Sequence, residues 1–459
     1  MRGFRTSNQP GDQPSNKPSD QPGDQPSPQS SYRPSYQSLF RTREFTPLFV
    51  SSSLQVAAST IGGLALGTSV YAATGSPFLS ALSMFGPSLA QVIGATTLLS
   101  AADRLPPRAT LTGLAVVFTA STAALALLAL PLWTVFAVIA AQGLVASLGG
   151  GVRWGLLNEI LPDDGYPLGR SLFNMLHGLT QIAGYATGGA LVALLSPAVT
   201  LLVSAALYAA AALCTALGLS HRAPRAAGRP SVAETWRTNA LLWSSAPRRR
   251  LYLGLWIPNG LVVGCESLFV AYAPDRAGLL FACAAFGMLL GDVTVGRLLP
   301  PRVRDRLATP LLLLLATPYL LFAFHPPTPA AAACAALASV GFGASLVQQH
   351  QLLTLTPPEL TGHALGLHSS GMLTLQGLSA ALAGATAQLT SPATAMTAMA
   401  GASMAVTLGL WAAGRDERTT AAVFPPVLTT GTAAAEAGRT TGRRARRRSA
   451  PGAARPARR

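Results

Sequence analysis

The feature that most constrains this chain is a series of long apolar stretches separated by short turns. Each stretch has ~20 residues or more, enough for an α-helix to cross the ~30 Å hydrocarbon core of a bilayer. Only 11% of the 459 residues are charged, against about 25% in soluble domains. Small residues are abundant inside the stretches and let membrane helices pack closely. We therefore expect an all-α integral membrane protein.

The pattern predicts twelve transmembrane helices. They are expected near residues 46–73, 77–102, 109–130, 131–162, 168–195, 199–219, 251–273, 278–299, 310–324, 329–356, 362–389 and 394–413. Basic turns follow the even-numbered helices, whereas the turns after odd-numbered helices are short and nearly uncharged. Because Arg- and Lys-rich loops stay in the cytoplasm, both termini are expected there. A wrong helix count would have scrambled this alternation.

A repeat relates the two six-helix halves of the sequence. Gln181 reappears 195 positions later as Gln376, and the Ser-Pro-Ala of 196–198 reappears as 391–393. Both halves begin on the same side of the membrane. They are therefore parallel repeats, related by an axis along the membrane normal.

Five parts are expected along the chain. A Gln-, Pro- and Ser-rich tail at 1–44 cannot bury a core and should be disordered in the cytoplasm. Six-helix bundles at 45–220 and 250–414 flank a basic cytoplasmic linker at 221–249, and a disordered Arg-rich tail follows at 415–459. The Trp, Leu and Arg pattern of the linker suits a short helix on the membrane surface, with an ordinary connector as the alternative.

The charge and cysteine content exclude several partners. A formal net charge of +16 would suggest nucleic acid in a soluble protein. Here the bases lie in the tails and alternate turns, so topology accounts for them and no nucleic-acid partner is expected. Lys17 is the only lysine, a bias typical of GC-rich bacterial genomes such as those of actinobacteria. The four cysteines lack metal-ligand spacing, so neither a metal nor a cofactor is expected.

The turn at 98–108, LLSAADRLPPR, carries the clearest family motif. Two six-helix halves, a basic central loop and this turn resemble the major facilitator superfamily (MFS) of transporters over about 46–413. The family signature GxLADRxGRR is matched at Asp103, Arg104 and Arg108. The resemblance implies an inner gate in which these residues bridge to the eleventh and fourth helices, where Glu159 is the natural partner. A surface pair that only fixes topology is the alternative.

Two further family signatures are partly present. The RxxQG of the fourth helix survives as IAAQG, in which Gln142 matches and Ile139 replaces the Arg linked to proton transfer. This loss weakens the case for proton antiport. The GxxxGPxxGG of the fifth helix, associated with exporters, is represented by GYATGG. Its matching glycines are Gly184, Gly188 and Gly189.

A transport path requires inward-facing polar groups near the middle of the helices. Gln181 and Gln376 fall about halfway along their helices, where they would line a site or form interhelical hydrogen bonds. His177 and His368 lie nearer the cytoplasm, and an unperturbed His titrates near neutral pH; lining or packing is favoured over proton carriage. The remaining candidates lie on other helices and are Gln55, Gln91, Gln142, Asn259, Gln348 and His350.

Glu266 and Asp292 are the acids placed deepest in the apolar stretches. Burial disfavours the charged form of a carboxyl group. A carboxyl that binds and releases protons as access alternates would couple transport to the proton gradient, and Glu266 is the candidate for this role. A static network around Glu266 is the alternative. Asp292 is expected to pair with Arg297.

The sequence therefore predicts a multi-pass plasma-membrane transporter that moves a small organic molecule by alternating access. Export is the favoured direction, and protons are a candidate coupling ion. The expected partners are the lipid bilayer, the substrate and protons, and the chain is expected to be a monomer. The alternatives are a non-transporting receptor or scaffold and a facilitated uptake uniporter. The sequence contains neither a catalytic set nor a GxxxxGK[ST] loop, so neither an enzyme nor an ATP-driven pump is expected.

Overall fold

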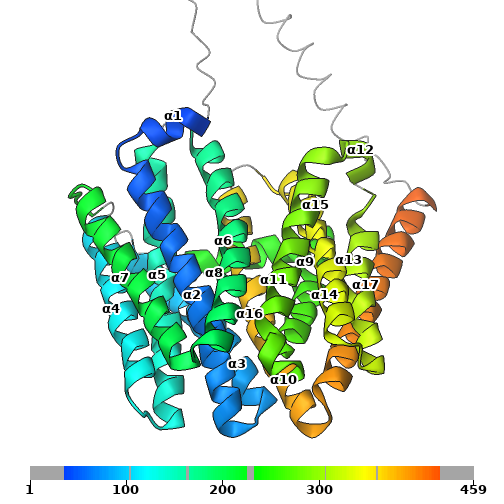
Figure 1. Ribbon diagram of the computed structural model, residues 1–459. Coiled ribbons are helices and arrows are strands. Elements are labelled where there is room, and N and C mark those ends of the chain that lie inside the picture. Colours follow the sequence, from blue (N-terminus) through cyan, green and yellow to red (C-terminus); the bar gives the residue numbers. More distant parts are fainter. Residues whose placement is uncertain are drawn as a thin grey trace, which may run out of the picture.

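The computed structural model describes residues 36–102, 105–161, 165–224, 232–304, 306–357 and 360–423. Within these residues the protein is helical and has no β-strand. Two helical bundles lie side by side, and the two ends of the described chain, α1 (Tyr36–Arg41) and α17 (Pro392–Val423), reach the same face (Figure 1).

The N-terminal bundle consists of six long helices. They are α2 (Phe45–Thr74), α3 (Pro77–Ala102), α4 (Pro107–Leu127), α5 (Leu132–Ile160), α6 (Tyr166–Leu194) and α7 (Pro197–Gly218). Proline opens α3, α4 and α7, where its missing N–H is not needed. The Ser196 hydroxyl caps α7 by accepting from the Val199 amide at 3.2 Å, and α2 ends at Gly75 with φ +62°.

The C-terminal bundle is built from more interrupted rods. Their parts are α9 (Ala246–Glu266) and α10 (Phe269–Tyr272); a 3₁₀ turn (Pro274–Arg276), α11 (Ala277–Val293) and a π-helical turn (Thr294–Leu298); α12 (Pro301–Arg304); α13 (Ala308–Ala316) with a 3₁₀ segment (Thr317–Phe324); α14 (Thr328–Val340), a 3₁₀ turn (Gly341–Gly343) and α15 (Ala344–Thr354); α16 (Thr361–Leu389); and α17. Helices therefore occur throughout the predicted stretches, and α17 continues well beyond the predicted end at 413.

The inner edges of the two tails that were predicted to be disordered are helical in the structure. Residues 36–41 form α1, because Leu39 is buried against the bundle and the Phe40 ring packs edge-on to Phe45 at 5.4 Å. At the other end α17 extends to Val423. The remainder of both tails lies outside the described residues.

The linker between the bundles forms α8 (Val232–Ser244), which packs on α9 and α16. Leu242 is fully buried, and the Trp243 ring stacks on Trp256 with centroids 5.7 Å apart. Trp236 and Leu241 are exposed on the same helix. Part of the linker is thus a short helix in the structure, and its location on a membrane surface stays a prediction.

Nine described helical segments are long and apolar enough to cross a membrane, so the protein is a multi-pass membrane protein. Three rods of the bundles fall outside that set. Two are α6, which carries His177 and Gln181, and α16, which carries His368 and Gln376. The third is the shorter apolar rod Ala308–Phe324.

α10 makes small contacts with α2 and α3, but two helix pairs form the main contacts between the bundles, α3 with α16 and α6 with α11. These pairs are equivalent under the sequence repeat. A Cβ atom built on Gly189 would lie 2.5 Å from the Gly278 Cα, and one built on Gly384 would lie 2.7 Å from the Phe78 Cα. Since no Cβ atom fits at such distances, both crossings require glycine. Gly189 and Gly384, which the repeat relates, therefore have the same packing role.

Contacts between the bundles gather at the end opposite α1, toward the bottom of Figure 1. There the Tyr71 hydroxyl donates to the Ala271 carbonyl at 3.5 Å, and the Ser76 hydroxyl donates to Gln388 Oε1 at 2.7 Å. The bundles are thus joined at this end by backbone crossings and by hydrogen bonds.

Candidate functional site

A cavity of about 280 Å³ lies between the two bundles. Helices of both bundles build it, with α3 and α6 on one side and α9, α11, α15 and α16 on the other. Its polar side chains are Gln181, Tyr185, Glu266, Asp292, Ser345, Gln349 and Gln376. Apolar side chains complete the wall: Phe85, Val263, Phe281, Ala284, Ala285, Met288, Phe342, Leu346 and Met372. We call this space the inter-bundle cavity.

The structure brings the repeat-related glutamines into this one cavity. Gln181 comes from α6 and Gln376 from α16, so each bundle contributes one amide of this pair, and Gln349 of α15 adds a third amide. Tyr185, one turn beyond Gln181, stacks on Phe281 of α11 at 4.6 Å. A molecule held between the two amides would therefore contact both bundles.

Glu266 enters the inter-bundle cavity from the end of α9 and is only 8% exposed. Its Oε1 accepts a hydrogen bond from the Ser339 hydroxyl at 3.3 Å. Within the described residues the ion pairs are those of Arg222, so Glu266 has no basic partner there. An ionised carboxylate in such a place lacks the compensation that a buried charge needs.

Asp292 also faces this cavity but is more exposed than Glu266. The expected ion pair with Arg297 is wrong, because Arg297 Nη2 lies instead 3.9 Å from the Met175 sulfur of α6. Arg297 lies in the π-helical turn Thr294–Leu298 that follows α11.

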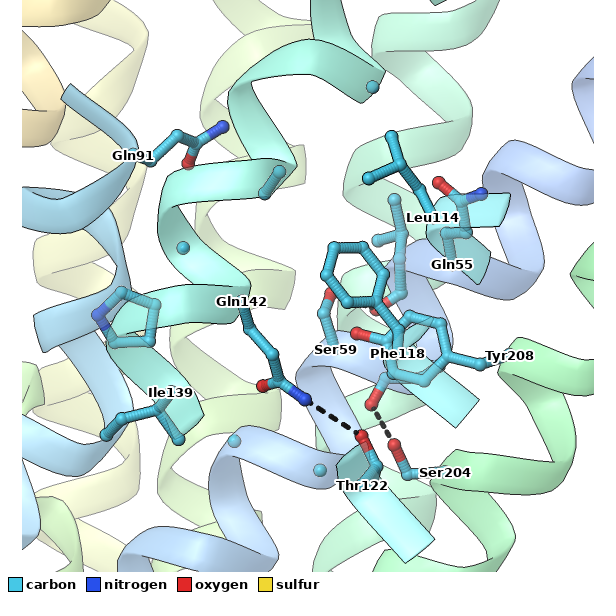
Figure 2. A pocket seen from close by; sticks show the side chains of 18 of the residues that line it. Gln55, Ser59, Gln91, Leu114, Phe118, Thr122, Ile139, Gln142, Ser204 and Tyr208 are labelled. Atoms are coloured by element: carbon cyan, nitrogen blue, oxygen red, sulfur yellow. Dashed lines mark hydrogen bonds between the residues drawn. The ribbon is translucent and has the colours of Figure 1, made fainter. Parts of the chain in front are cut away.

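A second cavity, of about 390 Å³, lies inside the N-terminal bundle. All six of its long helices contribute, and we call it the N-bundle cavity. In Figure 2 the Gln142 side chain stands on one side of the space, across from Ser59, Phe118 and Tyr208. The predicted path residues that line it are Gln55, Gln91, Gln142 and His177.

Two of these amides have fixed partners. Gln142 Nε2 donates to Ser121 Oγ at 2.6 Å and lies 3.4 Å from Thr122 Oγ1, so α4 and α5 are linked beside the cavity. Gln55 Oε1 accepts a hydrogen bond from Arg153 Nη2 at 2.5 Å.

Arg153 is a lining residue to which the sequence analysis gave no role. The lining positions of α5, which run from Ile139 through Gln142 and Ala146 to Arg153, recur every three or four residues and so form one helical face. The spacing of Arg153 from the degraded RxxQG motif could have placed it on the same helical face as Gln142. That spacing identifies a face of α5 but does not show that a cavity lies beside it.

The other path candidates occupy different environments. Gln348 lines a third cavity, of about 630 Å³, in the C-terminal bundle. His368 is buried with its Nε2 atom 3.3 Å from Gln349 Nε2. Asn259 is fully buried and donates to the Leu255 carbonyl at 2.6 Å, while His350 is exposed. Asn259 and His350 line none of these three cavities.

The predicted inner gate is described only in part. Asp103 and Arg104 lie outside the described residues, and Arg108 is partly buried at the start of α4. Glu159 Oε2 accepts a hydrogen bond from Arg222 Nη1 at 3.2 Å, and Arg222 Nη2 lies 3.1 Å from Glu44 Oε2. Arg222 is a partner that the sequence did not suggest. The gate role of Glu159 stays a prediction.

The glycines of the α6 motif lie at helix contacts. Cβ atoms built on Gly184 and Gly188 would lie 3.0 Å from the Thr60 Cβ and 3.2 Å from the Ile61 Cα, so both face α2. Gly189 faces α11. The motif therefore packs α6 closely on two neighbours, as small residues do in membrane helices.

Two helical bundles that meet at two symmetry-equivalent crossings around a polar cavity are the architecture of a membrane transporter. The chain belongs to the Major Facilitator Superfamily, whose sequence profile matches residues 48–351. No curated protein matches the sequence.

Solved transporter structures share the fold. A POT family transporter in complex with a thioalcohol-conjugated peptide is 12% identical, with a TM-score of 0.64 over 82% of this chain and 96% of that chain. A bacterial homologue of the human lysosomal transporter Spinster, inward-facing and occupied, is 14% identical, with a TM-score of 0.61 over 82% of this chain and 97% of that chain. The nucleoside transporter NupG is also 14% identical, with a TM-score of 0.60 over 80% of this chain and 98% of that chain. At these identities the likeness shows the fold alone.

Proposed function

We propose that this protein is a twelve-helix secondary transporter of the plasma membrane that exports a small organic molecule in exchange for protons. The observation that carries the proposal is the inter-bundle cavity, in which Gln181 and Gln376 face one space beside the buried Glu266. Transport by alternating access needs a site that both bundles share, because only then does a bound molecule favour one arrangement of the bundles over another.

The twelve spans consist of the nine apolar segments together with α6, α16 and the rod Ala308–Phe324. These three rods pack among the others in the same bundles. The basic linker and tails favour a cytoplasmic location for both termini. On that topology the joined end of the bundles is extracellular, and the structure corresponds to an inward-facing state.

Glu266 is the proposed coupling group. It forms no ion pair within the described chain, so holding it ionised in the closed cavity is unfavourable. A proton taken from the outside would neutralise Glu266 while the bundles change arrangement. Release of that proton to the cytoplasm would restore the carboxylate when the cavity is open. The loss of the Arg of RxxQG at Ile139 leaves this role to Glu266.

The direction of transport rests on the α6 glycine motif. Gly184 and Gly188 allow close approach to α2, and Gly189 allows close approach to α11. The pattern resembles the one associated with exporters, and we propose export on this basis.

The test uses the purified protein in sealed liposomes with an imposed pH gradient. Pooled small molecules are screened for gradient-driven accumulation with simultaneous proton flux. Glu266→Gln should abolish the gradient dependence while leaving exchange without a gradient intact. Asp275→Asn, which changes an exposed acid in the 3₁₀ turn before α11, is the matched control and should behave as wild type.

Other outcomes select other functions. Gradient-independent movement in the wild type would indicate a facilitated uniporter. Unchanged coupling in Glu266→Gln would exclude Glu266 as the coupling group. No movement of any compound would favour a receptor or scaffold, and a binding screen would then replace the transport assay.

A further inference from the structure

Arg153 holds a charge deep in the N-terminal bundle that the proposed coupling step does not use. It lies seven residues before Ile160, the last residue of α5, or about 10 Å along the axis. Its partner Gln55 lies ten residues after Phe45, the first residue of α2, or about 15 Å from that end. The guanidinium therefore reaches inward and does not extend to the bilayer edge as surface-anchored arginines do.

The N-bundle cavity supplies no counter-ion for this arginine. Its lining residues include no aspartate or glutamate. Within the described chain, Arg153 forms no ion pair, and its bonded partner is the neutral Gln55 amide. Arg153 is partly buried, and a cation inside a membrane bundle without an anion is unfavourable, so the cavity lacks one negative charge.

The shape and chemistry of the cavity suit an organic anion. A guanidinium has five N–H donors, of which Gln55 uses one, and two parallel donors match the two oxygens of a carboxylate. Phe118, Tyr208 and Leu114 provide an apolar wall for the rest of the molecule (Figure 2). A volume of about 390 Å³ falls within the range of small-molecule sites.

The inter-bundle cavity has the opposite charge. Glu266 and Asp292 line it, and no arginine, lysine or histidine does. The two cavities meet α6 one turn apart, at His177 and at Gln181. An anion is therefore attracted to the N-bundle cavity and repelled from its neighbour. We propose that the N-bundle cavity is a binding site for the carboxylate group of an organic molecule, with Arg153 as its anchor.

The identity of that molecule as cargo rests on the proposed transport function, but the binding itself does not. The full-length protein in detergent is therefore heated with acetate, benzoate or 2-naphthoate, each paired with its neutral amide at constant ionic strength. The carboxylates should raise the melting temperature of the wild type and the amides should not. Arg153→Gln should weaken carboxylate binding about tenfold to hundredfold, the loss of one charge-assisted contact.

Three further variants sharpen the test. Arg153→Lys keeps the charge but not the paired donors, and should retain part of the binding. Gln55→Glu places a carboxylate beside Arg153, and should abolish binding of added carboxylates while keeping the chain folded. Arg276→Gln, at an exposed turn, should bind as wild type. Gln55→Glu keeps the test valid if Arg153→Gln fails to fold.

Several results would overturn the assignment. They are equal stabilisation by amides and carboxylates, full binding in both Arg153→Gln and Gln55→Glu, the same effect from chloride at equal concentration, or no shift with any of the three acids. The melting assay measures binding without a pH gradient, whereas coupling is measured as gradient-driven flux in liposomes. Failure of the coupling hypothesis and failure of the anion site are thus separate observations.

Discussion

The two bundles share a sequence repeat but differ in how tightly they are packed. The first helix of each half shows the difference. Half of the residues in the apolar stretch of α2 are buried, against 89% of those in the equivalent stretch of Ala246–Tyr272. The C-terminal core joins buried aromatic residues such as Phe269, Phe281 and Tyr319. Each bundle also holds a cavity, of about 390 Å³ in the N-terminal bundle and about 630 Å³ in the C-terminal bundle, so the difference lies in how deeply the helices are buried and not in the presence of a cavity.

The same division extends to charge. The N-bundle cavity contains Arg153 and no acid, whereas the acids Glu266 and Asp292 face the inter-bundle cavity from C-terminal helices. The repeat has kept the crossing glycines Gly189 and Gly384, which the joining of the bundles requires. Gln181 and Gln376 are kept as well, but the other polar residues that line the cavities differ between the halves. The repeated halves therefore preserve the glycine contacts that hold them together, whereas the charged residues that face their cavities differ.

The largest expected effect comes from the crossings, where the bundles are alike. Gly189→Val and Gly384→Val should each lower stability by more than ~3 kcal/mol, because the new side chain meets backbone atoms that cannot move aside. Thermal unfolding in detergent measures the effect. Gly401→Val, which meets nothing within 4 Å, is the matched control. Similar losses in Gly401→Val would show that valine itself is harmful and that the crossings are not special.

A smaller loss of stability should distinguish the packing of the two bundles. Ala335→Leu enlarges a fully buried residue of the C-terminal core and should cost about 1–3 kcal/mol. Ala146→Leu adds the same atoms at a residue that lines the N-bundle cavity, and it should change stability by less than ~0.5 kcal/mol. Melting temperatures of the two variants give the comparison directly. Equal losses would mean that the N-terminal bundle is as rigidly packed as its partner.

The smallest effect concerns the ion pairs of Arg222 with Glu44 and Glu159. These side chains are partly exposed, so Arg222→Gln should cost no more than ~1 kcal/mol. The loss should shrink as salt concentration rises. Unfolding at low and high salt measures it, with Arg276→Gln as control. A large, salt-independent loss would indicate that this network has a structural role beyond charge pairing.

Much of the fold could be predicted from local sequence. Long apolar stretches locate the helices, and the repeat pairs Gln181 with Gln376, which share one cavity. The linker pattern left a short helix and an ordinary connector open, and the structure has a helix there, α8. Local pattern failed for Leu39 and Phe40, whose short apolar cluster docks on the bundle within a segment that resembles a polar tail.

The sites were only partly predictable. Asp292 and Arg297 are near in sequence, yet Arg297 lies in the π-helical turn after α11 and meets Met175 from the other bundle. Arg153 was not assigned a role, since nothing in its neighbours along α5 indicates a missing counter-ion. Its environment depends on which faces of the other helices surround it.

The sequence by itself determined the helical class, the approximate spans and the repeat, because hydropathy and helical periodicity are properties of neighbouring residues. Only the tertiary structure decided which polar side chains share a space. Gln55 and Arg153 are 98 positions apart, and their hydrogen bond exists because α2 and α5 pack in the same bundle. Charge balance in a cavity depends on every helix around it, and the chain order does not reveal that arrangement.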